Sequence, residues 1–230
     1  MSDSPHAKKV LRLVEDELEH LPIFPLQSVV LLPQNLLPLH IFEPRYRSMT
    51  EAALRSDLPI AMTLLAPGQT DALGRPRVHA FAGVGKILQH ERLPDGRFNI
   101  MLFGLARVRI EEELDVSTAY RQVRAVFEHS RVEDRQLLDV LMRSVQTLTL
   151  AIRKIEPKVA TELVRMSDES SEPDAVVDRL AGLFFPDYRQ RQRLLEEKVV
   201  ERRLSVVVDR MAQYLAQLRI ERGASESVLN

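Results

Sequence analysis

The sequence contains no cysteine, which excludes disulfide cross-links, thiolate metal sites and a cysteine nucleophile. It has no run of eighteen apolar residues, and its first twenty residues lack the uninterrupted apolar core of a signal peptide. We therefore expect a soluble, cytoplasmic protein that does not interact with a membrane. At 230 residues, the chain is long enough for one large or two small domains, each with a stable core.

The chain also lacks an excess of charge of either sign. Lysine and arginine total 32 against 33 for aspartate and glutamate, and residues 1–130 carry 15 cations against 16 anions. Domains that bind DNA or RNA usually carry a cationic patch that contacts phosphates. Nucleic acid is therefore not the favoured partner on composition alone.

Complete motifs for catalysis or cofactor binding are absent as well. The segment AFAGVGKI has Ala80 and Ile87 where a phosphate-binding loop needs a glycine and a hydroxyl. The six histidines show no spacing that would place two imidazoles on one metal, and there is no Gly-x-Ser-x-Gly elbow. We expect no catalytic residue, no metal and no cofactor, so the chain is not predicted to be an enzyme.

Before residue 130, proline and glycine separate short apolar runs of strand length. These runs are IFPLQSVVLLP, LLPLHIF, LPIAMTLLAPG, VHAFAGVGKILQHERL, RFNIMLFGLARVRIEEE and AYRQVRAVFEHS. LPDG at 93–96 predicts a hairpin turn. Pro33 and Pro38 fall inside the first two runs, where a missing N–H donor is tolerated at a sheet edge. We expect a small β-barrel over 21–130.

After residue 130 the apolar spacing becomes helical. The pattern predicts helices over 137–155, 158–167 and 173–184, then a further helix capped by Asp187. A final heptad stripe consists of Val200, Leu204, Val207, Met211, Tyr214 and Leu218. We expect a helical bundle over 131–220 in an α+β protein; the alternative use of the stripe is dimerisation, so the chain is predicted to be a monomer or a weak homodimer.

The two ends of the chain are expected to lie outside these domains. Residues 1–20 form a predicted tail that includes KKVLRLVEDEL, a segment able to form a short amphipathic helix. Residues 221–230 are predicted to be a disordered tail.

The stretch LPLHIFEPRYRSM concentrates polar residues at the predicted end of a strand. Alternation places Leu37, Leu39 and Ile41 on one face and His40 on the other. Pro44 suits the first position of a following helix, with Glu43 at its positive end. The cluster can be explained as a strand-to-helix corner, or as a binding site at that corner.

Three segments of the chain resemble the Lon substrate-binding domain, the N-terminal region of ATP-dependent Lon proteases. They begin at LPIFPLQSVVLLP, FAGVGKILQHERLPDGRF and AVVDRLAGLFFPDYRQ, occur in the family's order and extend over roughly residues 20–215. IFEPRYR is similar to the free-standing branch, which lacks the ATPase and Ser-Lys protease modules. The resemblance implies a PUA-like β-barrel followed by a helical bundle, and no catalytic residue.

The resemblance also implies a function. It suggests a protein-binding module that recognises unfolded or damaged polypeptides or acts as an adaptor to a protease or chaperone; the alternative is RNA binding, as in other PUA-like barrels. Exposed apolar side chains or an open strand edge would contact the client. The candidate contact residues are Leu36, His40, Phe42, Glu43, Arg45, Tyr46 and Leu93.

Overall fold

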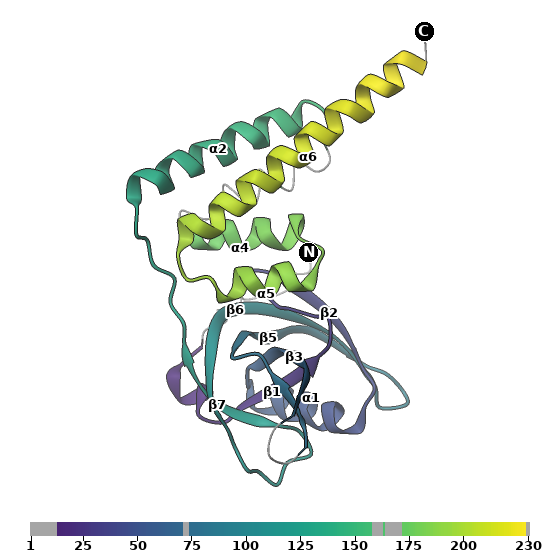
Figure 1. Ribbon diagram of the computed structural model, residues 1–230. Helices are drawn as coiled ribbons and strands as arrows, with labels where there is room; N and C mark the ends of the chain where they lie inside the picture. Colours follow the sequence, from purple (N-terminus) through teal and green to yellow (C-terminus); the bar gives the residue numbers. More distant parts are fainter. Residues whose placement is uncertain (1–12, 71–73, 158–162, 164–171, 229–230) are drawn as a thin grey trace, which may run out of the picture. The chain divides into compact units, whose positions relative to one another are not determined.

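The computed structural model of the chain describes residues 13–70, 74–157, 163 and 172–228 (Figure 1). It divides into two compact units between Phe127 and Glu128, close to the expected boundary at residue 130. We call these the barrel unit and the helical unit. No helix within the described ranges is long and apolar enough to cross a membrane.

The described residues of the barrel unit form seven strands, one α-helix and a short 3₁₀ helix. In chain order the elements are η1 (Glu15–Leu18), β1 (Leu21–Leu26), β2 (Leu36–Ile41), α1 (Pro44–Ser56), β3 (Ile60–Thr70), β4 (Pro76–Val78), β5 (Phe81–Arg92), β6 (Phe98–Glu113) and β7 (Gln122–Phe127). The β5–β6 turn is the hairpin predicted at LPDG, where the Gly96 N–H donates to the Leu93 carbonyl over 2.9 Å and Gly96 has a φ of 79°.

The sheet closes on itself through β1. Neighbouring strands pair in the order β1-β7-β6-β5-β3, and β1 also pairs in parallel with β3, from Ile23↔Ala61 to Leu26↔Leu64. Leu21, Ile23, Ala61, Val84 and Val123 are fully buried inside. Closure removes the free edges that an open sheet of these strands would expose. The predicted α+β fold, with strands before helices, is confirmed.

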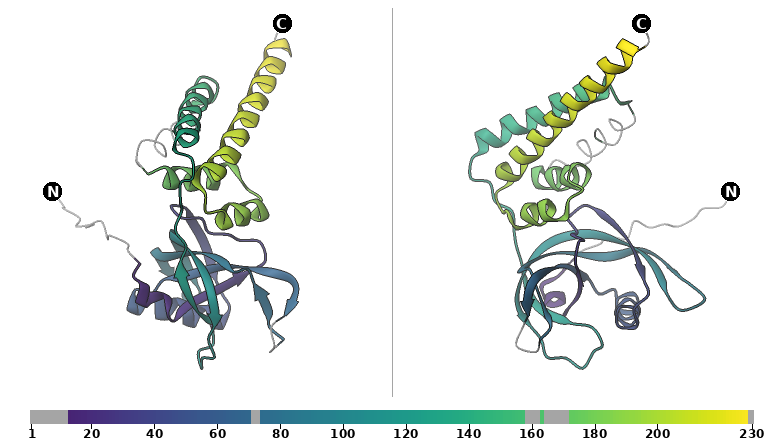
Figure 2. Two further views of the ribbon diagram at one scale, coloured as in Figure 1. Left: turned by 60° about the vertical axis from the view of Figure 1, so that its left-hand side comes forward. Right: turned by 45° about the vertical axis from the view of Figure 1, so that its right-hand side comes forward.

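Strand β6 is long enough to belong to two structures. Its second half, 108–113, pairs with β7 in the barrel, whereas its first half, 98–103, pairs with β2. Strand β5 accompanies it from Phe81↔Arg109 to Arg92↔Phe98. Strands β2, β6 and β5 therefore form a three-stranded arm that extends past the barrel (Figure 2).

The loop between β1 and β2 crosses the barrel against glycines. A Cβ on Gly83 would lie 1.8 Å from the Leu31 carbonyl oxygen, and one on Gly104 would lie 2.2 Å from that of Leu32. The predicted strand over 23–33 therefore ends early: β1 stops at Leu26, and the buried apolar residues Val30, Leu31 and Leu32 belong to this loop. Burial against the barrel wall, rather than strand pairing, explains their apolar character.

The helical unit contains α2 (Arg135–Arg153), α4 (Pro173–Phe184), α5 (Tyr188–Glu196) and α6 (Val200–Val228). The predicted cap at Asp187 is present, because its carboxylate accepts the Gln190 N–H over 2.9 Å. Helices α2 and α6 run in the same direction: Glu201 accepts the N–H of Asp134 at their beginnings, and the Tyr214 hydroxyl donates to Glu156 further along. The helix predicted over 158–167 lies outside the described residues apart from Leu163.

The expected tails differ from the structure at one end. Residues 221–228, predicted to be disordered, continue α6. The pair Gln217–Glu221, four residues apart with the Gln217 amide donating over 3.0 Å, supports the start of this extension. In the N-terminal segment η1 is the short helix observed, and residues 1–12 lie outside the described range.

A buried ion pair joins two helices of the helical unit. The Arg203 guanidinium on α6 is 1% exposed and donates to the Asp178 carboxylate on α4 and to the Ser130 hydroxyl. Removing one partner of a buried pair leaves a desolvated charge without compensation, which costs more than the pair itself contributes. The pair therefore makes the α4–α6 contact sensitive to single substitutions.

We expect Asp178→Ala to lower the free energy of unfolding of the helical unit by about 3 to 5 kcal/mol. Asp139→Ala is the matched control, because Asp139 pairs with Arg135 at 3.5 Å on the exposed side of α2, where removal costs about 0 to 1 kcal/mol. Urea denaturation followed by circular dichroism measures both. Equal losses for the two variants would show that Arg203 is not a buried, dependent charge.

Candidate functional site

The strand-to-helix corner has the backbone that the sequence predicts. Pro44 is the first residue of α1, and Glu43 is its N-cap with extended backbone angles. The Glu43 carboxylate does not cap the helix amides; it accepts from the Arg45 Nε over 3.0 Å. Both side chains are substantially exposed. The expected cap interaction of Glu43 is therefore replaced by a surface ion pair beside the corner.

Tyr46 is a core residue rather than a surface contact. It is 4% exposed, and its ring centroid lies 4.1 Å from that of Phe24. Burial raises the pKa of its hydroxyl above the usual value, although the neighbouring Arg45 opposes that rise. The expectation that Tyr46 contacts a client is corrected, because the helical face that carries it, with Met49 and Ala53, packs inward.

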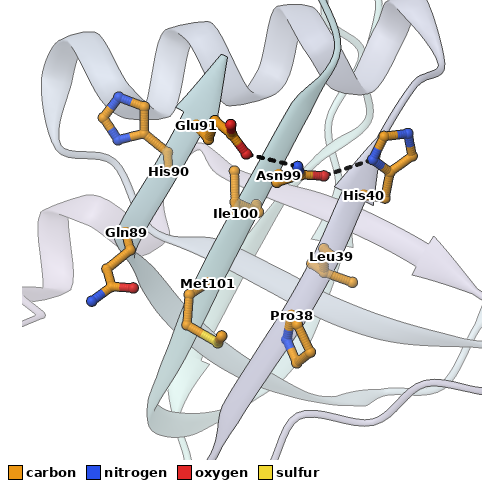
Figure 3. Close-up of a pocket in the computed structure, with 9 residues that line it drawn as sticks. All are labelled: Pro38, Leu39, His40, Gln89, His90, Glu91, Asn99, Ile100 and Met101. Carbon is orange, nitrogen blue, oxygen red and sulfur yellow. Dashed lines mark hydrogen bonds between the residues drawn. The ribbon is translucent and has the colours of Figure 1, made fainter. Parts of the chain in front are cut away.

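The exposed candidates line the outward face of β2. Leu36 is 56% exposed and lies opposite Phe103, Pro38 lies opposite Met101, and His40 lies opposite Asn99. Alternation along a strand places these side chains on one face. A groove runs across this region of the arm, lined by Pro38, Leu39, His40, Gln89, His90, Glu91, Asn99, Ile100 and Met101 (Figure 3).

One end of this groove is polar. The His40 Nδ1–H donates to the Asn99 amide oxygen over 2.7 Å, and the Asn99 amide donates to Glu91 over 3.0 Å (Figure 3). The His40 Nε2 can then accept from Arg97, whose guanidinium lies 3.3 Å away. The network links all three strands of the arm, so it fixes the His40 ring at the edge of β2.

The backbone of β2 has an open hydrogen-bonding edge. Next to the strand, the Gly104 N–H donates to the Asn35 carbonyl and the Gln34 N–H donates to the Gly104 carbonyl, with Gln34 at a φ of 63°. Hydrogen-bonded and non-bonded pairs alternate in an antiparallel ladder. Counting in steps of two from the bonded pair Asn35–Gly104, the backbone groups of Leu37 and Leu39 bond to β6. The backbone groups of the residues between them point away from β6.

The β5–β6 hairpin independently shows which residues of β2 direct their backbone away from β6. The Leu93 N–H donates to the Arg97 carbonyl over 2.8 Å, so alternation makes Glu91↔Asn99 a bonded pair of β5 and β6. Asn99 then turns its backbone groups toward β5, and its opposite neighbour His40 is left unbonded on the β2 side. Both routes therefore direct the backbone of Leu36, Pro38 and His40 outward.

No other strand occupies this edge in the part of the chain that the structure describes. Strand β2 pairs with β6 alone, and no backbone bond to Leu36, Pro38 or His40 from elsewhere is found there. Leu36 and His40 each present an N–H and a carbonyl, whereas Pro38 presents only a carbonyl. The edge is chemically suited to accept an extended backbone.

The remaining candidates divide by position. Phe42 is 60% exposed, and its ring centroid lies 6.3 Å from that of His40, so it continues the outward surface toward the corner. Leu93 is half-buried at the hairpin tip and is not among the residues that line the groove. Sequence reasoning missed Met101 and Asn99, which reach the site only through the register of β6 on β2.

Other chemistry is not indicated at this surface. Within the described ranges, no group of three histidine, cysteine, aspartate or glutamate side chains is arranged to hold a metal ion. The groove combines apolar side chains, from Pro38, Leu39, Ile100 and Met101, with polar ones, a mixture that suits an extended polypeptide.

Comparison with known proteins identifies the family. The family model for the ATP-dependent protease La (LON) substrate-binding domain matches residues 20–213. The chain belongs to the LON substrate-binding domain family. The match includes the seven described strands and about half of α6, so the family model extends over both units.

Sequence relatives of this LON substrate-binding domain are bacterial Lon proteases. It is 25% identical over 202 residues to Lon protease of Xanthomonas oryzae pv. oryzae, covering 88% of this chain and 24% of the relative. It is 26% identical over 223 residues to Lon protease of Dictyoglomus thermophilum, covering 97% and 28%. The chain thus spans about a quarter of the length of the curated relatives it matches.

Solved structures show the same fold. The N-terminal domain of Mycobacterium avium complex Lon protease superposes with a TM-score of 0.65 at 19% identity, covering 84% of this chain and 98% of that one. A Lon N-terminal domain protein from Xanthomonas campestris gives a TM-score of 0.55 at 23% identity, covering 83% and 97%. The LON substrate-binding domain fold therefore extends over most of the chain.

The hairpin tip beside His40 should respond to acid through Asp95. The backbone N–H of Arg97 donates to the Asp95 carboxylate and, with the Arg97 guanidinium, lowers the pKa of Asp95 below its usual value. The contact is thus present at neutral pH and is lost as the pH falls through that lowered pKa. In Arg97→Ala, NMR titration of the carboxyl should show a higher pKa that stays below the usual value, because the backbone N–H remains. An unchanged pKa would exclude the guanidinium as a contributor.

Proposed function

We propose that this domain binds extended segments of unfolded or damaged polypeptide as an added strand on the free edge of β2, without catalysing a reaction and without a cofactor. The observation that carries the proposal is the outward-facing backbone of Leu36 and His40, next to a groove with both apolar and polar side chains. Membership of the LON substrate-binding domain family supports recognition of protein substrates.

Strand addition suits a client that is defined by being unfolded. Main-chain hydrogen bonds provide affinity that is independent of the client's sequence, and pockets for alternate side chains provide selectivity. Here the client's side chains would alternate onto the face that carries Leu36, Pro38 and Met101. Unfolded chains expose the apolar residues that fit this face, whereas folded proteins bury them.

Binding alone would also suit an adaptor. A segment held at an edge by a few backbone bonds can be passed to a protease or chaperone, because its affinity does not depend on enclosing the client. We propose that the partner proteins of this domain are such clients and the machine that receives them. The proposal places the domain in substrate recognition for proteolysis, upstream of any cleavage.

The first test is fluorescence anisotropy with a labelled, permanently unfolded polypeptide. We expect saturable binding that Leu36→Asp weakens by about tenfold or more, because a charge replaces an apolar contact at the edge. Leu150→Asp is the matched control, since Leu150 is similarly exposed, at 57%, but lies on α2. Equal weakening by both variants would place the client elsewhere.

Excess RNA belongs in the same titration. If RNA displaces the polypeptide, or binds alone with a steep salt dependence, the domain is an RNA-binding barrel and the proposal fails. If neither ligand binds wild-type protein, general recognition of unfolded clients is excluded.

A backbone scan of a bound peptide tests the mode of binding. Methylating one peptide nitrogen at a time removes one donor without changing the side chains. Strand addition predicts a period of two: affinity falls at every second position, whose N–H faces β2, and is nearly unchanged at the positions between. Isothermal titration calorimetry measures the series. A loss without this alternation would indicate that side chains alone hold the client.

A further inference from the structure

Pro38 lies at the centre of the outward-facing edge, between Leu36 and His40. We infer that Pro38 sets which strands this edge accepts: it admits an extended segment of foreign polypeptide and excludes a second copy of β2. This inference rests on the proposed function for the identity of the client, whereas the exclusion of a second copy rests on the backbone geometry alone. Pro38 would then be a specificity-determining residue.

An exposed β2 edge is a hazard for self-association. Identical strands can pair antiparallel about a twofold axis, and this edge is bordered by exposed Leu36 and Phe42. Strand β2 is six residues long, and residues that oppose each other must both direct their backbones toward the partner strand. Two registers with five residues of overlap meet this condition, and Pro38 withholds two N–H donors in both. In one of them Pro38 of each copy lies opposite His40 of the other, and in the second the pairing is centred on Pro38. Leu36 of each copy then lies opposite His40 of the other, and Pro38 lies opposite Pro38.

At that central position the two prolines oppose each other. A pair that faces across an antiparallel ladder normally exchanges two N–H···O bonds. With proline on both sides neither bond forms, and each ring places a carbon where the opposing carbonyl needs a donor. A dimer of this kind therefore lacks both hydrogen bonds at its central pair, and only the two outer Leu36–His40 pairs can form theirs.

A foreign strand meets the proline once. Its residue opposite Pro38 still donates its own N–H to the Pro38 carbonyl, and its neighbours exchange both bonds with Leu36 and with His40. One hydrogen bond is missing, whereas two are missing when β2 pairs with a second copy. The same proline therefore weakens association with a second copy more than it weakens association with a client.

The side chains along the edge also favour one orientation of the client. Leu36 and Pro38 lie beside Phe103 and Met101, whereas His40 lies beside Asn99, with Arg97 within hydrogen-bonding distance. A segment that fills the edge needs about five residues, to reach from Leu36 to His40. Its apolar side chains fit the Leu36 end, and a polar side chain fits the His40 end.

The test is Pro38→Val, which restores an N–H and keeps an apolar side chain suited to a strand. Sedimentation velocity over a concentration series should show a homodimer whose dissociation constant is about tenfold or more below that of wild type, because two bonds are regained at the axis. Affinity for the unfolded polypeptide, which regains one bond, should change less.

A double variant supplies the matched control. In Leu36→Pro/Pro38→Val the proline is moved by two residues to the start of β2, where it is tolerated. The self-pair then forms as many bonds as in wild type, so dimerisation should return to the wild-type level. Dimerisation as strong as that of the single variant would show that the interface is not the β2 edge.

The outcomes separate the two proposals. A folded Pro38→Val protein that stays as monomeric as wild type overturns the inference, even if wild type binds polypeptide. Conversely, a dimeric variant supports the exclusion of a second copy even if wild type binds no client, in which case the proposed function fails alone. Circular dichroism checks folding; should the valine variant fail to fold, Pro38→Ala restores the same N–H and is judged by the same criterion.

Discussion

The recognition edge depends on one constraint, the alternation of hydrogen bonds along β6. Because each residue of a strand turns its N–H and carbonyl to the same side, the bonds that β6 makes to β5 determine which residues remain for β2. The hairpin turn fixes that assignment at one end, and the bonds of Gln34 and Asn35 to Gly104 fix it at the other. The outward direction of His40 is thus determined from two sides, by backbone bonds at both ends of the arm.

A second constraint is the close approach of backbone to backbone over the barrel. Gly83 and Gly104 have no room for a Cβ because the loop at Leu31 and Leu32 lies directly against them. This loop leads into β2, so its packing against the glycines determines where the edge strand begins. Gly83, which belongs to the incomplete phosphate loop, is explained instead by this contact, and it positions the candidate site indirectly.

Local signals in the sequence predicted local structure well. Alternation in LPLHIF placed His40 and Leu39 on different faces of the strand, and Pro44 marked the start of α1. Both predictions depend on neighbouring residues alone. The contribution of Met101 was not predictable, since it follows from the register between strands some sixty residues apart. Tyr46 was misplaced for a different reason: it was grouped with the apolar side chains near the corner as a candidate contact, whereas packing against Phe24 holds it in the core.

The closure of the barrel has a consequence for how the chain folds. Strand β1 completes the ring by pairing with β7, where Leu21 meets Val123, about a hundred residues later in the sequence. Contacts of such high sequence separation require the intervening chain to be ordered first, and they slow folding. During synthesis the β5–β6 hairpin, whose contacts are local, can form as soon as it leaves the ribosome, whereas the pairing of β1 with β7 has to wait for the end of the barrel unit. A domain proposed to hold unfolded chains would thus pass through an interval in which one edge of its own apolar first strand is open to pairing.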